Sequence, residues 1–218
     1  MALSKRLFAL ANQVDDNSSV FDVGADHGLL EKYLIDNKKA HMICAVENKT
    51  GPFSVLSNNL KGYNVTLSLS DGIEELNECY DTLIIAGMGG KLICDILSKH
   101  LEKLIYIKNI IIDAHRDVYD VRKYLVNRGF YIFFEDIIKE NNKFYFIIKF
   151  KRGKENYSDL ELKYGSKILN NDVFNEYIEN EKKKICDNLN KINNSLNCEE
   201  KRKILINELE RLKEYENN

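Results

Sequence analysis

Residues 20–28 read Val-Phe-Asp-Val-Gly-Ala-Asp-His-Gly, and this stretch decides the fold. An apolar strand runs directly into an Asp-x-Gly turn, and further small residues help to form a tight loop. Open α/β sheets bind nucleotide-like ligands at such a junction of strand, turn and helix, outside the carboxyl ends of the strands. The stretch therefore predicts the first strand of an α/β sheet followed by a ligand-binding loop. A glycine turn that merely reverses the chain is the alternative.

The loop differs from those that bind dinucleotides. The fingerprint Gly-x-Gly-x-x-Gly is absent, and Asp26 takes the place of its second glycine. That glycine must let a pyrophosphate approach the backbone, and a carboxylate in its place repels phosphate. A cationic or zwitterionic ligand is therefore favoured. S-adenosylmethionine (SAM), which has a sulfonium and an ammonium and no phosphate, suits the loop better than NAD does.

On both sides of this loop, short apolar runs alternate with amphipathic stretches up to residue 150. Strands are predicted at residues 19–24, 41–47, 65–70, 80–86 and 109–114, and helices at residues 29–37, 53–61, 90–100 and 118–128. Such alternation is typical of parallel strands joined by crossover helices. Residues 131–138 and 144–150 flank a short polar turn and predict an antiparallel hairpin that closes the sheet. The predicted fold class is α/β, a doubly wound and Rossmann-like domain.

The pattern changes after residue 153, so we place a domain boundary there, between residues 1–153 and residues 154–218. Residues 154–165 are mixed and polar, and they predict a linker or a short helix. Beyond residue 171, apolar residues recur at spacings of 3, 4 or 7 without glycine or proline, which is typical of a coiled coil. A break at residues 193–197 predicts an antiparallel α-helical hairpin.

The composition excludes several classes of protein. The chain has 218 residues, of which 44% are hydrophobic and 30% charged, as expected for a folded domain. No apolar run reaches the roughly 18–20 residues that span a bilayer, and the first ten residues lack a signal-peptide core. We therefore expect a cytoplasmic protein with no membrane partner. The five cysteines are widely spaced and form no Cys-x-x-Cys pair, which argues against a disulfide framework and a metal site.

Two further acidic residues follow predicted strands. Glu47 lies about 20 positions after Gly24, where an acid can accept hydrogen bonds from both ribose hydroxyls of an adenosine. Asp71 follows the third strand in Ser70-Asp71-Gly72, a position that commonly meets the adenine amino group in SAM-dependent enzymes of this fold. Each has a plainer interpretation, a solvated acid for Glu47 and an ordinary Asp-Gly turn for Asp71.

The fourth and fifth predicted strands end in unusual stretches. Residues 86–90 read Ala-Gly-Met-Gly-Gly, and three glycines in four positions allow a ligand to approach closely and leave free amides at a helix start. Residues 113–116 read Asp-Ala-His-Arg, a polar cluster placed to face a substrate. A structural histidine and a surface arginine are the alternatives for His115 and Arg116.

Together these stretches resemble the bacterial tRNA (adenine-22, N1)-methyltransferases, the TrmK family. The matching stretches are Leu3-Ser4-Lys5-Arg6-Leu7, Asp22-Val23-Gly24-Ala25-Asp26-His27, Glu47, Gly51-Pro52-Phe53, Asp71-Gly72, Ile85-Ala86-Gly87-Met88-Gly89-Gly90 and Lys143-Phe144-Tyr145. The resemblance covers nearly the whole chain, because the predicted helical hairpin corresponds to the family's C-terminal coiled-coil domain. One departure is Asp113-Ala114-His115, which stands where the family carries Gln-Pro-Asn.

The resemblance implies a class I SAM-dependent methyltransferase that acts on N1 of adenine 22 of tRNA. The SAM-binding residues it implies are Asp22, Gly24, Asp26, Glu47, Asp71, Gly72, Ala86, Gly87 and Met88. The implied catalytic residues are Asp26 and His27. The residues expected to contact tRNA are Lys5, Arg6, Gly89, Gly90, His115, Arg116 and Tyr145. We expect tRNA as the partner and no obligate protein partner.

N1 of adenine has a free lone pair, so its methylation needs alignment and charge stabilisation rather than a general base. Asp26 is the first candidate for that stabilisation, and His27 would orient the loop or the base. With a net charge of -2, local clusters must supply the phosphate contacts. The clusters, each of which has a solvated helix face as its alternative, are Lys5-Arg6, Arg116, Arg122-Lys123, Lys182-Lys183-Lys184 and Lys201-Arg202-Lys203.

Three other functions stay open. A nicotinamide-dependent oxidoreductase is disfavoured by Asp26 in the glycine loop. A non-catalytic SAM-binding adaptor would bind SAM without turnover on any RNA. A methyltransferase that acts on another adenine or another RNA is favoured by one feature, the altered stretch at residues 113–115.

Overall fold

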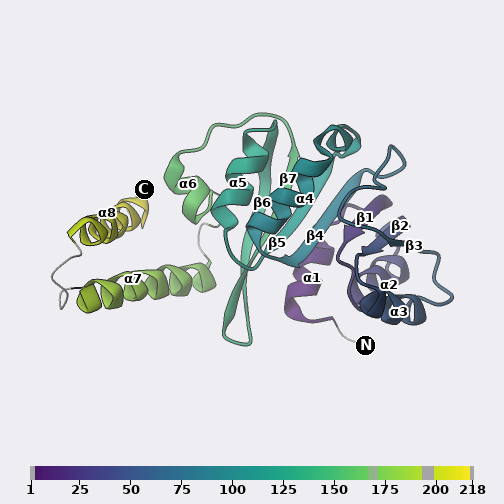
Figure 1. Ribbon diagram of the computed structural model, residues 1–218, viewed down its shortest axis with the longest axis horizontal. Helices are drawn as coiled ribbons and strands as arrows, with labels where there is room; N and C mark the ends of the chain where they lie inside the picture. The colour runs from purple at the N-terminus through teal and green to yellow at the C-terminus, as the bar shows by residue number, and fades with distance from the viewer. Residues whose placement is uncertain (1–2, 167, 169–170, 193–198, 217–218) are drawn as a thin grey trace. The chain divides into compact units, whose positions relative to one another are not determined.

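The computed structural model describes residues 3–166, 168, 171–192 and 199–216 (Figure 1). The chain forms two compact units, Met1–Glu155 and Asn156–Asn218. The first unit is an α/β domain, and the described elements of the second unit are helices. None of the helices in the described ranges combines the length and the apolar character needed to cross a membrane.

A seven-stranded sheet in the order β3-β2-β1-β4-β5-β7-β6 forms the centre of the first unit. Its strands are β1 (Ser18–Val23), β2 (Ala40–Glu47), β3 (Thr66–Leu69), β4 (Thr82–Met88), β5 (Asn109–Ala114), β6 (Phe130–Glu140) and β7 (Lys143–Arg152). Strands β1 to β5 pair in parallel, whereas β7 runs antiparallel to both β5 and β6. The strand order reverses at β1, which pairs with both β2 and β4. Ligands of open α/β sheets bind at this switch point.

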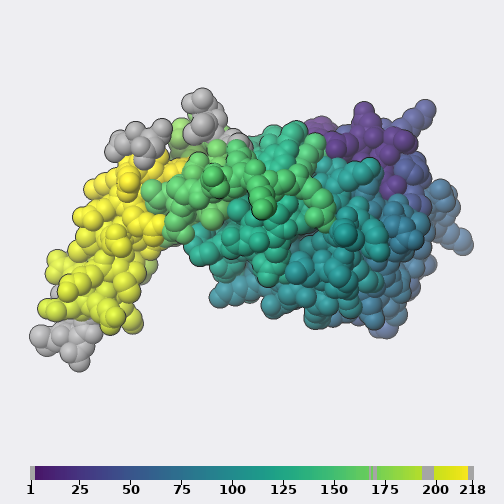
Figure 2. Space-filling view, turned by 90° about the horizontal axis from the view of Figure 1, so that it is seen from above, coloured from purple at the N-terminus to yellow at the C-terminus, as the bar shows by residue number. Residues whose placement is uncertain are grey.

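Helices cover both faces of the sheet (Figure 1). They are α1 (Lys5–Asn12), α2 (Leu29–Asp36), α3 (Thr50–Asn59), α4 (Gly90–Lys99), η1 (Leu101–Tyr106) and α5 (Val118–Val126). Helices α1 and α2 share a core with Ile84 and Ile111, while α4 packs beside α5. Figure 2 shows the N-terminal segment that holds α1, in purple, at the surface beside the blue segments. Because all residues of β1 and β5 are buried, the structure confirms the predicted doubly wound fold.

The first unit differs from the sequence prediction in several elements. Helix α1 was not predicted, although Ser4 caps it by accepting a hydrogen bond from the Leu7 amide; η1 was also missed. Strand β4 continues to Met88 through a bulge after Ala86 instead of ending at residue 86. The predicted turn at residues 139–143 is a two-residue turn, because Asn141 and Asn142 adopt φ angles of 51° and 59°.

The second unit contains α6 (Asp159–Tyr164), α7 (Asp172–Ile192) and α8 (Glu199–Glu216). A capping box of Ser158 and Glu161 starts α6, so residues 154–165 include the short helix that was one of the two expectations. Helix α7 packs against α8, and the Lys163 ammonium on α6 donates to Glu208 on α8 at 2.6 Å. The predicted pair of long helices is confirmed, while the predicted break at residues 193–197 lies outside the described residues.

Candidate functional site

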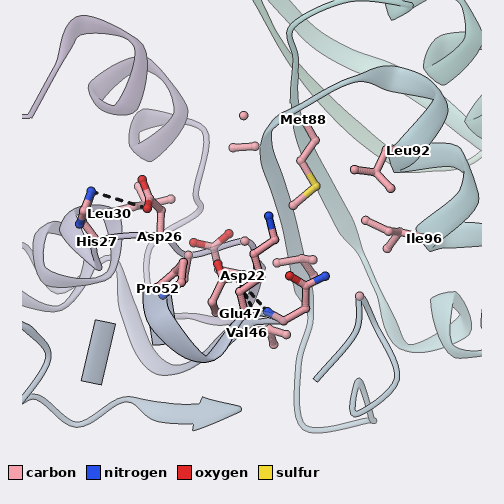
Figure 3. Close-up of a pocket in the computed structure, with 18 of the residues that line it drawn as sticks. Asp22, Asp26, His27, Leu30, Val46, Glu47, Pro52, Met88, Leu92 and Ile96 are labelled. Carbon is pink, nitrogen blue, oxygen red and sulfur yellow. Dashed lines mark hydrogen bonds and ion pairs between the residues drawn. The ribbon is translucent and has the colours of Figure 1, made fainter. Parts of the chain in front are cut away.

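A cavity of about 660 Å³ opens at the carboxyl ends of β1, β2 and β4 (Figure 3). Its size is typical of small-molecule sites, and it lies at the switch point of the sheet. Every residue predicted to bind the cofactor lines it: Asp22, Gly24, Asp26, Glu47, Asp71, Gly72, Ala86, Gly87 and Met88. The structure thus brings this set together from four separate strand ends.

The loop after β1 is built by close backbone packing. The amides of Gly24 and Ala25 donate to the Val46 carbonyl at 2.9 and 3.1 Å, which ties the loop to the end of β2. Gly24 has a φ of 80°, and a Cβ there would collide with the Cε of Met88. The backbone angle is therefore what favours glycine here, because the end of the Met88 side chain could move aside. The Met88 side chain lies close against this loop at the edge of the cavity.

Asp22, on the floor of the cavity, has a second buried acid beside it, Glu31. Asp22 on β1 is 4% exposed, and Glu31 in the first turn of α2 is fully buried. Burial raises the pKa of Asp22 to about 6. Burial and the neighbouring Asp22 carboxylate raise the pKa of Glu31 well above its usual range. Two neighbouring carboxyl groups that are both buried cannot both ionise, so Glu31 keeps its proton and Asp22 faces the cavity as the anion.

The other two acids at strand ends are held differently. A Glu47 carboxylate oxygen accepts the amides of Asn48 and Lys49 at 3.0 and 2.9 Å, which fixes the side chain at the end of β2. Asp71 accepts from the Lys99 ammonium at 2.6 Å, and this hydrogen bond lowers the pKa of Asp71. A cavity lined by these carboxylates fits a ligand with positive charge, hydroxyls and an amine better than one with phosphates.

Asp26 and His27 lie together at the opening of the cavity. Their side chains are 72% and 61% exposed, and the His27 Nε2 lies 3.6 Å from the Asp26 carboxylate. In Figure 3 the two side chains point toward each other on the side of the cavity opposite Met88, Leu92 and Ile96. Their catalytic role stays a prediction.

The wall beside Gly87 carries a second charged cluster, which we call the Arg6 cluster: Arg6, Asp113, His115 and Tyr145. The Arg6 guanidinium donates to Asp113 Oδ2 at 2.6 Å, and the His115 Nε2 lies 4.0 Å from the same oxygen. The Tyr145 ring lies 5.4 Å from both the guanidinium and the His115 ring. Arg6 and His115 line the cavity, as expected for residues that contact substrate.

The remaining residues predicted to contact tRNA lie outside the cavity lining: Lys5, Gly89, Gly90, Arg116 and Tyr145. Gly90 has a packing role, because a Cβ there would collide with the backbone of Asp117. The Arg122 prediction is wrong: Arg122 is fully buried and pairs with Glu135, so it is sealed from phosphate.

Sequence reasoning missed Glu31 and gave Asp113 no place among the site residues. Glu31 left no clear signal, because a charged residue in the first turn of a helix is ordinarily solvated. For Asp113 the sequence does contain a signal, because a carboxylate at the end of a buried strand needs a partner.

Comparison with known proteins identifies the family. Residues 3–148 match the family described as "Methyltransferase domain". The tRNA (adenine(22)-N(1))-methyltransferase of Bacillus subtilis is 30% identical over 172 residues, which is 76% of this chain and 72% of that protein.

Two solved structures share the fold. A protein of the NADB-Rossmann superfamily from Streptococcus agalactiae has a TM-score of 0.93 and 33% identity, covering 99% of this chain and 97% of its own. A putative tRNA (m1A22) methyltransferase from Streptococcus pneumoniae, solved in complex with S-adenosyl-L-methionine, has a TM-score of 0.89 and 28% identity, covering 98% and 99%. With its methyltransferase domain, its fold and its relatives, this chain belongs to the TrmK family of tRNA (adenine-22, N1)-methyltransferases.

Proposed function

We propose that this chain transfers a methyl group from SAM to N1 of adenine 22 of tRNA. The observation that carries the proposal is the cavity at the switch point, which is lined by the carboxylates of Asp22, Asp26, Glu47 and Asp71. The family supports it: the Bacillus subtilis relative is named for this activity, and the Streptococcus pneumoniae neighbour was solved with SAM.

Each of the acids at the strand ends binds a different group of SAM. Asp22 accepts from the ammonium group, because it is the buried anion on the cavity floor. Glu47, held by two backbone amides, accepts from the ribose hydroxyls. Asp71 accepts from the adenine amino group. The bound cofactor supplies an electrophilic methyl group on a sulfonium, and the backbone around Gly87 and Met88 frames the methyl site.

The target base needs alignment and charge stabilisation. Positive charge grows on the ring as N1 is methylated, and a nearby carboxylate lowers the barrier. Asp26 has this role, with His27 beside it at 3.6 Å. N1 lies on the Watson–Crick edge, so the base must be unpaired or flipped to be reached. The Tyr145 ring is the candidate for stacking, which is worth roughly 1–3 kcal/mol per base.

The body of the tRNA is the proposed partner for two regions. In the first unit, Lys5, Arg6, Gly89, Gly90, His115, Arg116 and Tyr145 contact the RNA around the cavity. In the second unit, α7 and α8 form an arm that recognises tRNA by its shape. Lys201, Arg202 and Lys203 are exposed on α8, whereas Lys182 and Lys184 on α7 pair with glutamates of the same helix. The α8 cluster therefore has the freer charge for phosphate.

The test uses the purified full chain, tritiated SAM and bulk unmodified tRNA, followed by nucleoside mass spectrometry and mapping of the modified position. We expect 1-methyladenosine at position 22. Methylation elsewhere would move the assignment to another adenine or another RNA. SAM binding without transfer to any RNA would favour the adaptor, and binding of NADH in place of SAM would favour the oxidoreductase.

A further inference from the structure

The Arg6 cluster lies against the proposed methyl site. A Cβ at Gly87 would lie 3.6 Å from the Arg6 Nη1 and 3.9 Å from the His115 Nε2. The members come from distant parts of the chain, since Arg6 is on α1, Asp113 on β5 and Tyr145 on β7. The fold thus places a permanent cation on the cavity wall, beside the backbone that frames the methyl site.

That cation creates an electrostatic problem for the proposed reaction. The guanidinium of Arg6 is charged at all relevant pH values. Adenine methylated at N1 is also a cation, so charge of the same sign grows nearby during transfer. Repulsion between like charges is stronger where water is excluded than in bulk solvent. An uncompensated Arg6 would therefore oppose the chemistry that the cavity otherwise favours.

Asp113 supplies the opposite charge. Its side chain is fully buried, its Oδ2 accepts from Arg6 at 2.6 Å, and it does not line the cavity. Burial raises the pKa of Asp113, and the hydrogen bond from Arg6 counteracts that rise. A hydrogen bond between two charged groups also holds the planar guanidinium in one orientation.

We propose that Asp113 is a positioning residue for methyl transfer: it fixes Arg6 on the wall beside Gly87 and neutralises the guanidinium there. This inference rests on the proposed function. Asp113 does not touch the substrate, because it is sealed behind the residues that line the cavity. Its effect therefore falls on the rate of transfer and on the placement of Arg6, and leaves the binding of SAM unchanged.

The test is the substitution Asp113→Asn in the full chain, which keeps the shape and removes the charge. With unmodified tRNA and tritiated SAM, we expect kcat to fall by about 10- to 100-fold, less than the about 100- to 1000-fold lost when a donor that touches the reacting group is removed, because Asp113 acts through Arg6. The Kd for SAM, measured by calorimetry, stays at the wild-type value.

A double variant separates charge compensation from structural support. Arg6→Gln combined with Asp113→Asn removes both charges and leaves two neutral amides in their place. If Asp113 compensates Arg6, the double variant is faster than Asp113→Asn alone although it carries one more substitution. A merely structural role predicts that it is equally slow or slower.

The matched control is Glu135→Gln. It neutralises another fully buried carboxylate that pairs with an arginine, Arg122, and neither residue lines the cavity. We expect it to lower the melting temperature and to leave kcat unchanged well below that temperature.

The outcomes are distinguishable. An inactive wild type overturns the proposed function and this inference with it. An active wild type overturns this inference alone if Asp113→Asn keeps its kcat, or if the double variant is no faster than the single one. Should Asp113→Asn not fold, the double variant is compared with Arg6→Gln alone, since both lack the Arg6 contact with RNA. With no guanidinium to compensate, the added Asp113→Asn should change kcat by less than about tenfold, one 1.36 kcal/mol step in barrier, and a larger loss contradicts the proposal.

Discussion

Two regions beside one cavity each contain a buried carboxyl group, and the two groups have opposite kinds of partner. On the floor, Asp22 lies against a second acid, Glu31; beside Gly87, Asp113 lies against a base, Arg6. Burial raises the pKa of each acid, but Arg6 opposes the rise at Asp113 whereas Asp22 adds to the rise at Glu31. The first pair therefore retains a proton and one negative charge that is free to attract a ligand cation. In the second pair, the Arg6 guanidinium already neutralises the negative charge of Asp113.

Removing the charge on the floor should have the largest effect on the cofactor. We expect Asp22→Asn to weaken SAM binding by about 10- to 100-fold, the range of a hydrogen bond to a charged group. Calorimetry at pH 7.5 measures it, with Asp113→Asn as the control that keeps the affinity. Equal losses in both variants would break the comparison, because the two acids would then serve the same ligand.

Asp22 and Asp113 also show which features of the site could be predicted from the sequence. The alternation of apolar runs and the loop at residues 22–28 predicted the sheet, a ligand site at the carboxyl ends of its strands and the position of Asp22. The partners could not be predicted in that way. Arg6 and Asp113 are 107 positions apart and meet only because α1, which was missed, packs on the same sheet. Glu31 has the pattern of a solvated helix residue, and its burial depends on how α2 is rotated against β1.

The floor pair predicts a pH dependence of SAM binding. The pKa of Asp22 is raised to about 6, so the anion that attracts the ammonium is lost as the pH falls through that value. An α-amino group with a pKa near 8 stays charged over the same range. We expect the affinity for SAM to fall about tenfold between about pH 7 and pH 5. A flat profile, measured by calorimetry at constant ionic strength, would mean that Asp22 does not meet the cation.

The stability of the cofactor-free protein should change in the opposite direction. The folded pKa of Asp22 lies above its ordinary value of 3.8, so the folded protein binds this proton more tightly than the unfolded chain does. That contribution is complete below about pH 4 and is lost as the pH rises through about 6, on the order of 3 kcal/mol. In denaturant titrations at several pH values, Asp22→Asn should flatten this part of the curve. If the free energy of unfolding of the wild type rose from about pH 4 to 7 relative to that of Asp22→Asn, the predicted loss of stability would be contradicted.

Replacing the buried proton donor should have a smaller effect. We expect Glu31→Gln to keep SAM binding near the wild-type affinity, because a neutral amide, like the protonated acid, can donate a hydrogen bond to Asp22. Glu31→Leu removes the donor and should weaken binding by about 3- to 10-fold, as for the loss of one ordinary hydrogen bond. Melting temperatures show whether the protein still folds, and a leucine there should not lower them, since a buried acid is replaced by an apolar group. Equal affinities for the two variants would show that Asp22 needs no partner.

The smallest effect is expected at Asp71, an acid whose partner is exposed. Asp71 pairs with Lys99 at 2.6 Å, and both side chains are 53% exposed. Because solvent screens such a pair, Lys99→Met should shift the melting temperature by less than about 2 °C. SAM affinity should change by less than about threefold, since water replaces the lost ammonium at an exposed carboxylate. A tenfold loss in the Lys99→Met calorimetry would show that Lys99 itself reaches the cofactor. A result within the expected range would sharpen the contrast, because burial of the partner, and not its charge alone, would then decide what each acid does for the site.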